Sequence, residues 1–206
     1  MSDVPELPFT GERYVPGIHG QIELEHRHRY YMARQLAAGK RMLDIACGEG
    51  YGTEILAATA AYAVGVDIDA QTVDHARKRY VRENLSFTVG TCEHIPLPDR
   101  SVDLVVSFET LEHTDQHEQM LSEITRVLTP DGVLLVSTPN RAIYRAANGL
   151  PNPFHMKELE LPEFIELLGR YFANTHPSGQ RVAYGSLIAP LESRRSLNEF
   201  MAIPEN

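Results

Sequence analysis

The stretch Leu43-Asp-Ile-Ala-Cys-Gly-Glu-Gly-Tyr-Gly52 decides the fold class of this 206-residue chain. Its apolar first half predicts a buried strand, its alternate glycines predict a tight turn, and a helix is expected after them. No Gly-x-Gly-x-x-Gly dinucleotide fingerprint is present, and no Gly-Lys-Ser/Thr follows. The glycines alone are therefore also compatible with a turn that needs them only for its geometry.

Apolar runs and amphipathic segments alternate on both sides of this stretch. Strands are expected at residues 41–46, 62–67, 85–89, 102–108 and 133–137, with helices at 23–37, after Asp69, and along the apolar stripe from Met120 to Leu128. This alternation predicts an α/β fold, with a mostly parallel, Rossmann-like sheet and helices on both faces. We expect one domain over residues 1–206: an N-terminal arm and helix (1–38), a core (39–138), a lid (139–160), a C-terminal helix with strands near 171–175 and 180–188 (161–191), and a tail (192–206).

Composition excludes several functional classes. The 43% hydrophobic content is too high for a disordered chain. With 19 Lys and Arg against 28 Asp and Glu, the net charge of −9 disfavours binding of long nucleic acid or of an anionic membrane surface. No apolar run reaches the roughly 20 residues of a membrane span, and the N-terminus lacks the pattern of a signal peptide. Two cysteines, Cys47 and Cys92, indicate a reducing compartment, so we expect a cytoplasmic protein; the oligomeric state is not indicated.

Polar residues follow the neighbouring strands where each one ends. Asp67 ends the second strand, and a carboxylate there can bind two ribose hydroxyls. Cys92 and Glu93 follow the third strand, and Ser107 and Phe108 end the fourth. Because these ends share one edge of a parallel sheet, they predict a nucleoside pocket.

These motifs together resemble the class I S-adenosylmethionine-dependent methyltransferases. The resemblance rests on Asp44 to Gly50, Val66 to Asp69, Pro96 to Ser107 and Arg126 to Leu135. It implies a seven-stranded sheet whose last strand is antiparallel, and S-adenosylmethionine as the cofactor. The cofactor-binding residues that it implies are Asp44, Ala46, Cys47, Gly48, Gly50, Asp67, Ile68, Cys92, Glu93, Ser107 and Phe108. Gly90-Thr91 departs from the Gly-Asp of many relatives, which weakens the adenine assignment nearby.

Glu109-Thr-Leu-Glu-His113 follows the fourth strand and is the candidate acceptor site. Methyl transfer is an in-line displacement, in which positioning supplies much of the rate, and a hydroxyl acceptor must also lose its proton to a base or a metal. Glu109, Glu112 and His113 could supply either; the alternative is a helix-capping pair of acids beside a solvated histidine. The chain locally resembles small-RNA 3′-terminal ribose methyltransferases, with His155 as a later histidine. That resemblance implies a Mg²⁺, Mn²⁺ or Zn²⁺ site of Glu109, Glu112, His113 and His155.

The N-terminal third and the lid suggest the acceptor. The chain resembles a bacterial subgroup associated with polysaccharide or glycan assembly at Gly11 to Gly17, Ile22 to Tyr30, Ser107 to His113, Ser137 to Asn140 and Asn152 to His155. A sugar or glycan hydroxyl is therefore the first expected acceptor. The alternatives are an RNA 3′ end, a small quinone or phenol, and a non-catalytic binding module. Arg13 or Tyr14 could close over the methionyl end of the cofactor, or only anchor the N-terminal arm.

Overall fold

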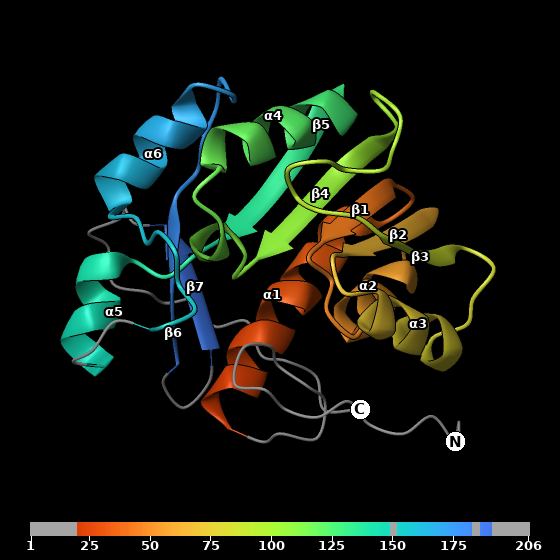
Figure 1. Cartoon of the computed structure of the whole chain (residues 1–206), viewed down its shortest axis with the longest axis horizontal. Coiled ribbons are helices and arrows are strands. Elements are labelled where there is room, and N and C mark those ends of the chain that lie inside the picture. The colour runs from red at the N-terminus through yellow and green to blue at the C-terminus, as the bar shows by residue number, and fades with distance from the viewer. Residues whose placement is uncertain (1–19, 149–151, 183–185, 191–206) are drawn as a thin grey trace.

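Five parallel strands form the central sheet of the computed structural model, which describes residues 20–148, 152–182 and 186–190 (Figure 1). The strands are β1 (Arg41–Ile45), β2 (Tyr62–Asp67), β3 (Leu85–Val89), β4 (Val102–Phe108) and β5 (Leu128–Ser137). They lie in the order β3-β2-β1-β4-β5. The order reverses between β1 and β4, and in such sheets ligands bind at the carboxyl ends of the strands that flank this reversal.

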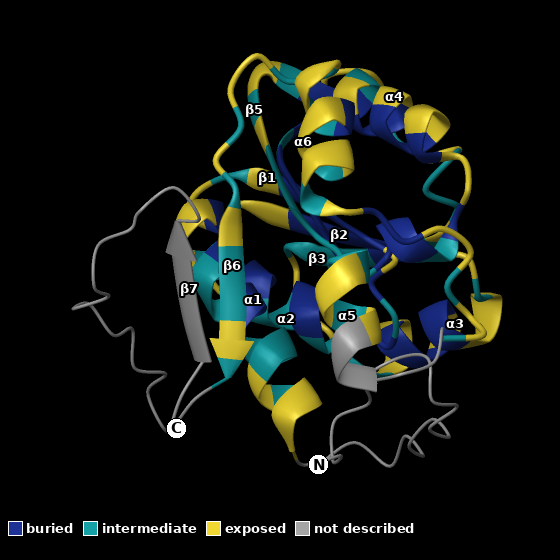
Figure 2. Cartoon of the chain, turned by 90° about the vertical axis from the view of Figure 1, so that its left-hand side faces the viewer, coloured by how far each residue is buried: buried dark blue, intermediate teal, exposed yellow. Residues whose placement is uncertain are grey.

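Helices cover both faces of the sheet, as expected. One face carries α1 (Gln21–Ala37), α2 (Tyr51–Ala57) and α3 (Ala70–Arg79), and the other carries α4 (His117–Val127) and α6 (Leu161–Gly169) (Figure 2). Successive residues of a strand point to opposite faces. In β1, Met42 therefore packs with α1 and α2, whereas Leu43 and Ile45 pack with α4.

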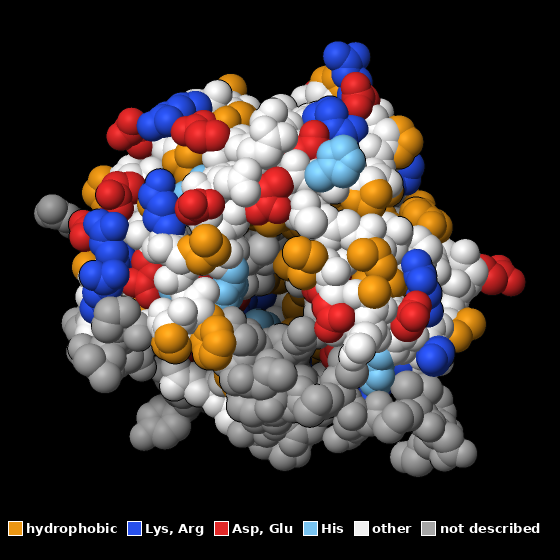
Figure 3. All heavy atoms as spheres, viewed as in Figure 1, with side chains coloured by type: hydrophobic (Ala, Val, Ile, Leu, Met, Phe, Trp, Pro, Cys, Tyr) orange, Lys and Arg blue, Asp and Glu red, His pale blue; other side chains and the backbone are white. Residues whose placement is uncertain are grey.

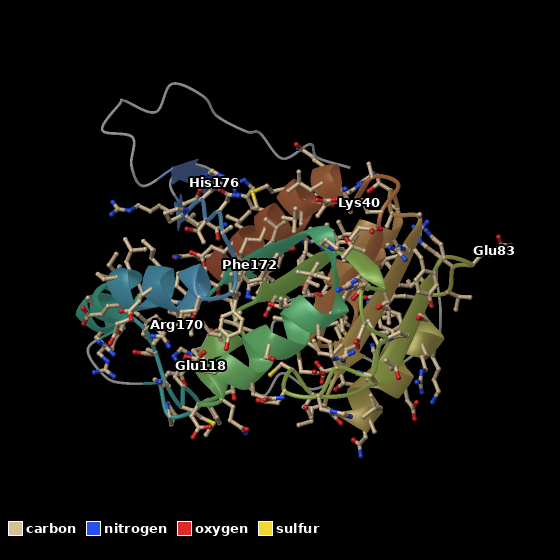
Figure 4. The ribbon with its side chains drawn as sticks, turned by 90° about the horizontal axis from the view of Figure 1, so that it is seen from above. Lys40, Glu83, Glu118, Arg170, Phe172 and His176 are labelled. Carbon is tan, nitrogen blue, oxygen red and sulfur yellow. The ribbon has the colours of Figure 1, made fainter. Side chains whose placement is uncertain are left out.

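The two helices of the α4 face are joined at the surface. Arg170, just after α6, donates a hydrogen bond to Glu118 of α4, and the Tyr171 hydroxyl donates to the same carboxylate at 2.6 Å (Figure 4). Phe172 packs against the apolar core beneath them. The strand expected at residues 171–175 is not formed, because Tyr171 and Phe172 continue from α6 in a turn, with both backbone N–H groups bonded to the carbonyl oxygen of Leu168.

The expectation of one seven-stranded sheet is wrong for the described residues. β6 (Ser178–Val182) and β7 (Ser186–Pro190) pair only with each other, as a separate antiparallel sheet. This pair lies along α1, where the Gln180 amide donates to the backbone oxygen of Glu25 at 3.1 Å. This pair therefore packs on α1 instead of adding two strands to the central sheet.

The lid is more ordered than the long connection that the sequence predicts. It contains α5 (Arg141–Asn148) and returns to the sheet edge through a β-bridge between Asn140 and Leu159. Within the described residues, no helix is both long enough and apolar enough to cross a membrane.

Candidate functional site

The glycine turn after β1 has an unusual backbone. Ala46, Gly48 and Gly50 have positive φ values of 58°, 56° and 93°. Gly50 is required by packing as well, since a Cβ there would lie 2.7 Å from the Phe87 ring. A Cβ on Gly48 would meet no atom within 4 Å, so the turn is open to a ligand on that side.

Asp67, at the end of β2, holds this turn in place. One of its carboxylate oxygens accepts a hydrogen bond from the Gly48 N–H at 2.8 Å, and the other accepts from the Asp69 N–H at 3.0 Å. Each carboxylate oxygen can accept a further bond, so Asp67 can still bind hydroxyl groups. Ile68 follows with 72% of its surface exposed, which leaves an apolar side chain free to face a ring.

Asp44 and Cys47, two of the predicted cofactor residues, have side chains buried away from solvent. Asp44 is fully buried and accepts hydrogen bonds from the hydroxyls of Thr53 at 2.7 Å and Tyr30 at 3.2 Å. Burial raises the pKa of Asp44 to about 7, although these two bonds oppose the shift. The Cys47 side chain packs with Val73 of α3. Both side chains therefore support the turn from behind, and could affect a ligand only through it.

The ends of β3 and β4 are also brought to this edge. The Thr114 hydroxyl donates to Glu93 at 2.7 Å and so links the segments that follow the two strands. Cys92 packs its side chain on the core of the α4 face, and Ser107 is buried with no hydrogen-bond partner for its hydroxyl. Phe108 lies beneath the Arg29 guanidinium, which is 5.9 Å from its ring centroid.

Glu109 begins the acceptor side and is held by residues of α1 and β5. Its φ of +53° is a left-handed conformation that is strained for a glutamate. The backbone is held by a bond from the Glu109 N–H to the Ser137 carbonyl oxygen at 3.0 Å. The carboxylate accepts from Arg29 of α1 at 2.7 Å and from the Ser137 hydroxyl at 2.6 Å.

Glu112 lies in the short 3₁₀ helix Leu111–His113 and is almost fully buried. Its carboxylate accepts a hydrogen bond from the Thr138 hydroxyl at 2.9 Å. Burial and then the negative charge of Glu109 raise the pKa of Glu112 well above its usual range. Its backbone oxygen accepts from the N–H groups of Met156 and Lys157, which fastens the lid to this point.

Two histidines complete the acceptor side. His113 donates a hydrogen bond from Nδ1 to the Phe154 carbonyl oxygen at 3.2 Å, which assigns the proton to Nδ1 and the lone pair to Nε2. The Nε2 atom is 4.0 Å from a Glu112 oxygen. His155 donates from Nδ1 to Glu158 at 2.7 Å, and its Nε2 accepts from the Asn152 amide at 3.1 Å. The two imidazole rings are 5.2 Å apart.

Three of the four predicted metal ligands come together. One ligand atom from each of Glu112, His113 and His155 lies within 4.8 Å of the others. Glu109 is not part of this cluster, because Arg29 and Ser137 hold its carboxylate. The molecular surface is hollowed on the side shown in Figure 3, with histidine and hydrophobic side chains around the hollow.

Comparison with known proteins agrees with the strand-end geometry. Residues 43–136 match a family model described as a methyltransferase domain. A protein from Mycolicibacterium smegmatis named "Probable S-adenosylmethionine-dependent methyltransferase" is 44% identical over 165 residues, which cover 79% of this chain and 63% of that protein. The core of the chain therefore matches a methyltransferase domain, and most of the chain is similar to a protein named as an S-adenosylmethionine-dependent methyltransferase.

Two other proteins extend the comparison. A Mycobacterium tuberculosis protein with the same descriptive name is 37% identical over 165 residues, covering 79% of this chain and 60% of that protein. The solved structure of the YcgJ protein from Bacillus subtilis has a TM-score of 0.62 and 26% identity, over 75% of this chain and 70% of that one. The chain spans about three fifths of the length of the two curated relatives.

The methyltransferase cofactor fits the residues at the ends of β1 and β2. The open side of Gly48 leaves room for a ligand against the backbone, and Asp67 retains acceptor capacity for ribose hydroxyls. The exposed Ile68 adjoins them. The predicted residue Tyr14, and Arg13 beside it, lie outside the described residues.

Three side chains of the candidate site were missed by sequence reasoning. Arg29 is 80 positions from Glu109, whereas Ser137 is the last residue of β5 and Thr138 follows it. The stretch containing Arg29 supported the glycan resemblance, but no spacing connected it with Glu109. Only the packing of α1 across the sheet edge brings them together.

Proposed function

We propose that this chain transfers a methyl group from S-adenosylmethionine to a hydroxyl of a sugar or glycan. The observation that carries the proposal is that the glycine turn follows β1, whereas Glu109, Glu112 and His113 follow the adjacent strand β4. When bound, S-adenosylmethionine supplies an electrophilic methyl group. The chain's own residues must then bind the cofactor, place the acceptor and remove its proton.

The cofactor would be held mainly by the glycine turn and Asp67. The backbone at Ala46 to Gly48 would contact the methionyl part, and Asp67 would accept hydrogen bonds from the ribose hydroxyls. Ile68 would pack against the adenine, with Cys92 and Glu93 farther along the same edge. Removal of the exposed Ile68 surface from water on binding would add to affinity.

His113 would accept the proton of the acceptor hydroxyl. Its Nδ1 is occupied by the Phe154 carbonyl oxygen, so its basic nitrogen is Nε2. A fixed tautomer of this kind suits general-base catalysis. Glu109 and Arg29, joined by an ion pair, would supply polar contacts for other hydroxyl groups of a sugar.

An acceptor screen tests this proposal. Release of S-adenosylhomocysteine is measured with monosaccharides, glycans, RNA 3′ ends, quinones and phenols. We expect release with a sugar or glycan; release only with RNA ends or phenols would replace the acceptor class. If neither S-adenosylmethionine nor S-adenosylhomocysteine raises the melting temperature, the proposal is wrong at the cofactor step, as it would be for a non-catalytic binding module.

We also propose that Glu112, His113 and His155 bind Mg²⁺ or Mn²⁺. The ion would then acidify the acceptor hydroxyl, and His113 would act as a metal ligand and not as the base. A carboxylate and two imidazoles are suitable donors, and their proximity favours this arrangement. His155 would have to exchange its bond with the Asn152 amide for the ion.

Calorimetry with Mn²⁺ distinguishes the metal-dependent mechanism from the metal-free mechanism, in which His113 is the base. His113→Ala should abolish Mn²⁺ binding, whereas Glu109→Gln should leave it unchanged, because Glu109 lies outside the cluster. Full activity in a chelator would rule out a catalytic metal. The cytoplasmic location stays a prediction.

A further inference from the structure

Glu49 stands between the two left-handed glycines of the turn, yet its carboxylate is almost completely buried, at 1% exposure. One carboxylate oxygen lies 2.9 Å from Nε2 of His75, which is on α3. The other accepts a hydrogen bond at 2.7 Å from the hydroxyl of Tyr80, the residue that ends α3. The turn is therefore tied to both the middle and the end of this helix.

A buried carboxylate is costly unless hydrogen bonds compensate it. Here both of its oxygens have a partner, and these partners are themselves well held. Tyr80 bonds its backbone N–H to the Ala76 carbonyl oxygen, and its ring lies below the Arg79 guanidinium at 5.7 Å. Burial and the bond to Glu49 raise the pKa of Tyr80 well above its usual range, so the phenol remains a donor.

We propose that Glu49 is a positioning residue that holds the cofactor turn in its binding conformation by anchoring it to His75 and Tyr80 of α3. The inference rests on the proposed use of this turn for S-adenosylmethionine.

The turn is strained on the ligand side and anchored on the opposite side. Ala46, Gly48 and Gly50 all have positive φ, a conformation that needs support from its surroundings. The bond from the Gly48 N–H to Asp67 is on the side where the ribose would bind, so cofactor binding can disturb it. Glu49 is buried in the protein instead, so a ligand at the open side of the turn does not have to break its bonds.

The hydrogen bonds of Glu49 also connect the glycine turn with the segment that contains Asp67. α3 begins directly after Asp67-Ile68-Asp69, and the Asp69 carboxylate caps it by accepting from the Gln71 N–H at 3.0 Å. Glu49 therefore fixes the turn relative to the helix that follows the ribose-binding acid. Preorganisation of this kind increases affinity because less ordering remains to be done on binding.

The test measures S-adenosylhomocysteine binding by calorimetry, together with hydrogen exchange of the ligand-free protein. We expect Glu49→Ala to weaken binding at least tenfold and to speed exchange of the amides from Gly48 to Gly52. Tyr80→Phe should weaken binding about threefold, and Glu49→Gln should retain more affinity than Glu49→Ala, because its amide oxygen can still accept from Tyr80.

Ile124→Ala is the matched control. Ile124 is fully buried on α4, in the core cluster on the opposite face of the sheet from α3. This variant should lower the melting temperature without changing affinity or exchange in the turn. If Glu49→Ala and Tyr80→Phe both bind within twofold of the wild type, or if Ile124→Ala weakens binding equally, Glu49 is only a stability residue. If the wild type binds no S-adenosylhomocysteine, the proposed function fails, while the exchange comparison still decides whether Glu49 holds the turn.

Discussion

The two halves of the site are built in different ways. The cofactor half comes almost entirely from residues 43–69, in which β1, the glycine turn, α2 and β2 follow one another. The acceptor half combines α1, the residues after β4, the end of β5 and the lid. The first is set largely by chain-local geometry and the second by long-range packing. Changes in one half should therefore have little effect on the other.

His113→Ala tests this independence with the largest expected effect. Loss of a general base typically lowers rates by about 100- to 10,000-fold, and we expect a fall in kcat of about 1,000-fold. S-adenosylhomocysteine affinity should stay within twofold of the wild type. Initial rates and calorimetry on the same preparation check both values; a parallel loss of affinity would show that the two halves are coupled.

Asp67→Ala should affect the cofactor half alone. Hydrogen bonds to charged groups are each worth about 1.5–3 kcal/mol, so loss of two bonds to ribose should weaken S-adenosylhomocysteine binding by about 100-fold or more. Asp74→Ala is the control, because Asp74 is an exposed acid on the adjacent α3 with its side chain 61% exposed. Unchanged affinity in Asp67→Ala would refute the ribose assignment.

Substitutions at Gly52 and Gly48 distinguish an effect on packing from an effect on ligand binding within the cofactor half. A Cβ at Gly52 would lie 2.0 Å from the Tyr30 ring, so Gly52→Ala should lower the free energy of unfolding by about 1–3 kcal/mol. A Cβ at Gly48 has free space, so Gly48→Ala should be destabilised less but should bind S-adenosylhomocysteine poorly. Urea unfolding and calorimetry measure the two effects, and equal stability losses would contradict this distinction.

The last comparison concerns the pH dependence of stability. The folded pKa of Asp44 is raised to about 7, so its contribution to stability is greatest below about pH 4 and is lost as the pH rises towards 7. Asp44→Asn should therefore flatten the unfolding free energy between pH 4 and pH 7. Asp103 gives the opposite sign, because the hydrogen bond from Arg41 lowers its pKa to about 2. Its contribution is lost as the pH falls from about 4 to 2, and Asp103→Asn should remove only that acid-side loss.

The reliable sequence predictions concern segments whose pattern is local. The five strands of the central sheet were found because each is a short apolar run, and the start of α3 was found because Asp69 can cap it. α5 was missed inside the expected lid, since its short amphipathic pattern lies in a stretch rich in Pro, Asn and Gly. The prediction of a strand at residues 171–175 is wrong, because the apolar rings of Tyr171 and Phe172 pack against the core from a turn and not from a strand.

The sequence by itself determined the order of elements, the glycine turn and the acids at the strand ends, because strand period, backbone freedom and charge are properties of neighbouring residues. Tertiary structure decided which acids meet which partners. Arg29 takes Glu109 away from the predicted metal cluster, and β6 and β7 pack on α1 instead of extending the sheet. These outcomes depend on the packing of segments far apart in the chain, which no local pattern records.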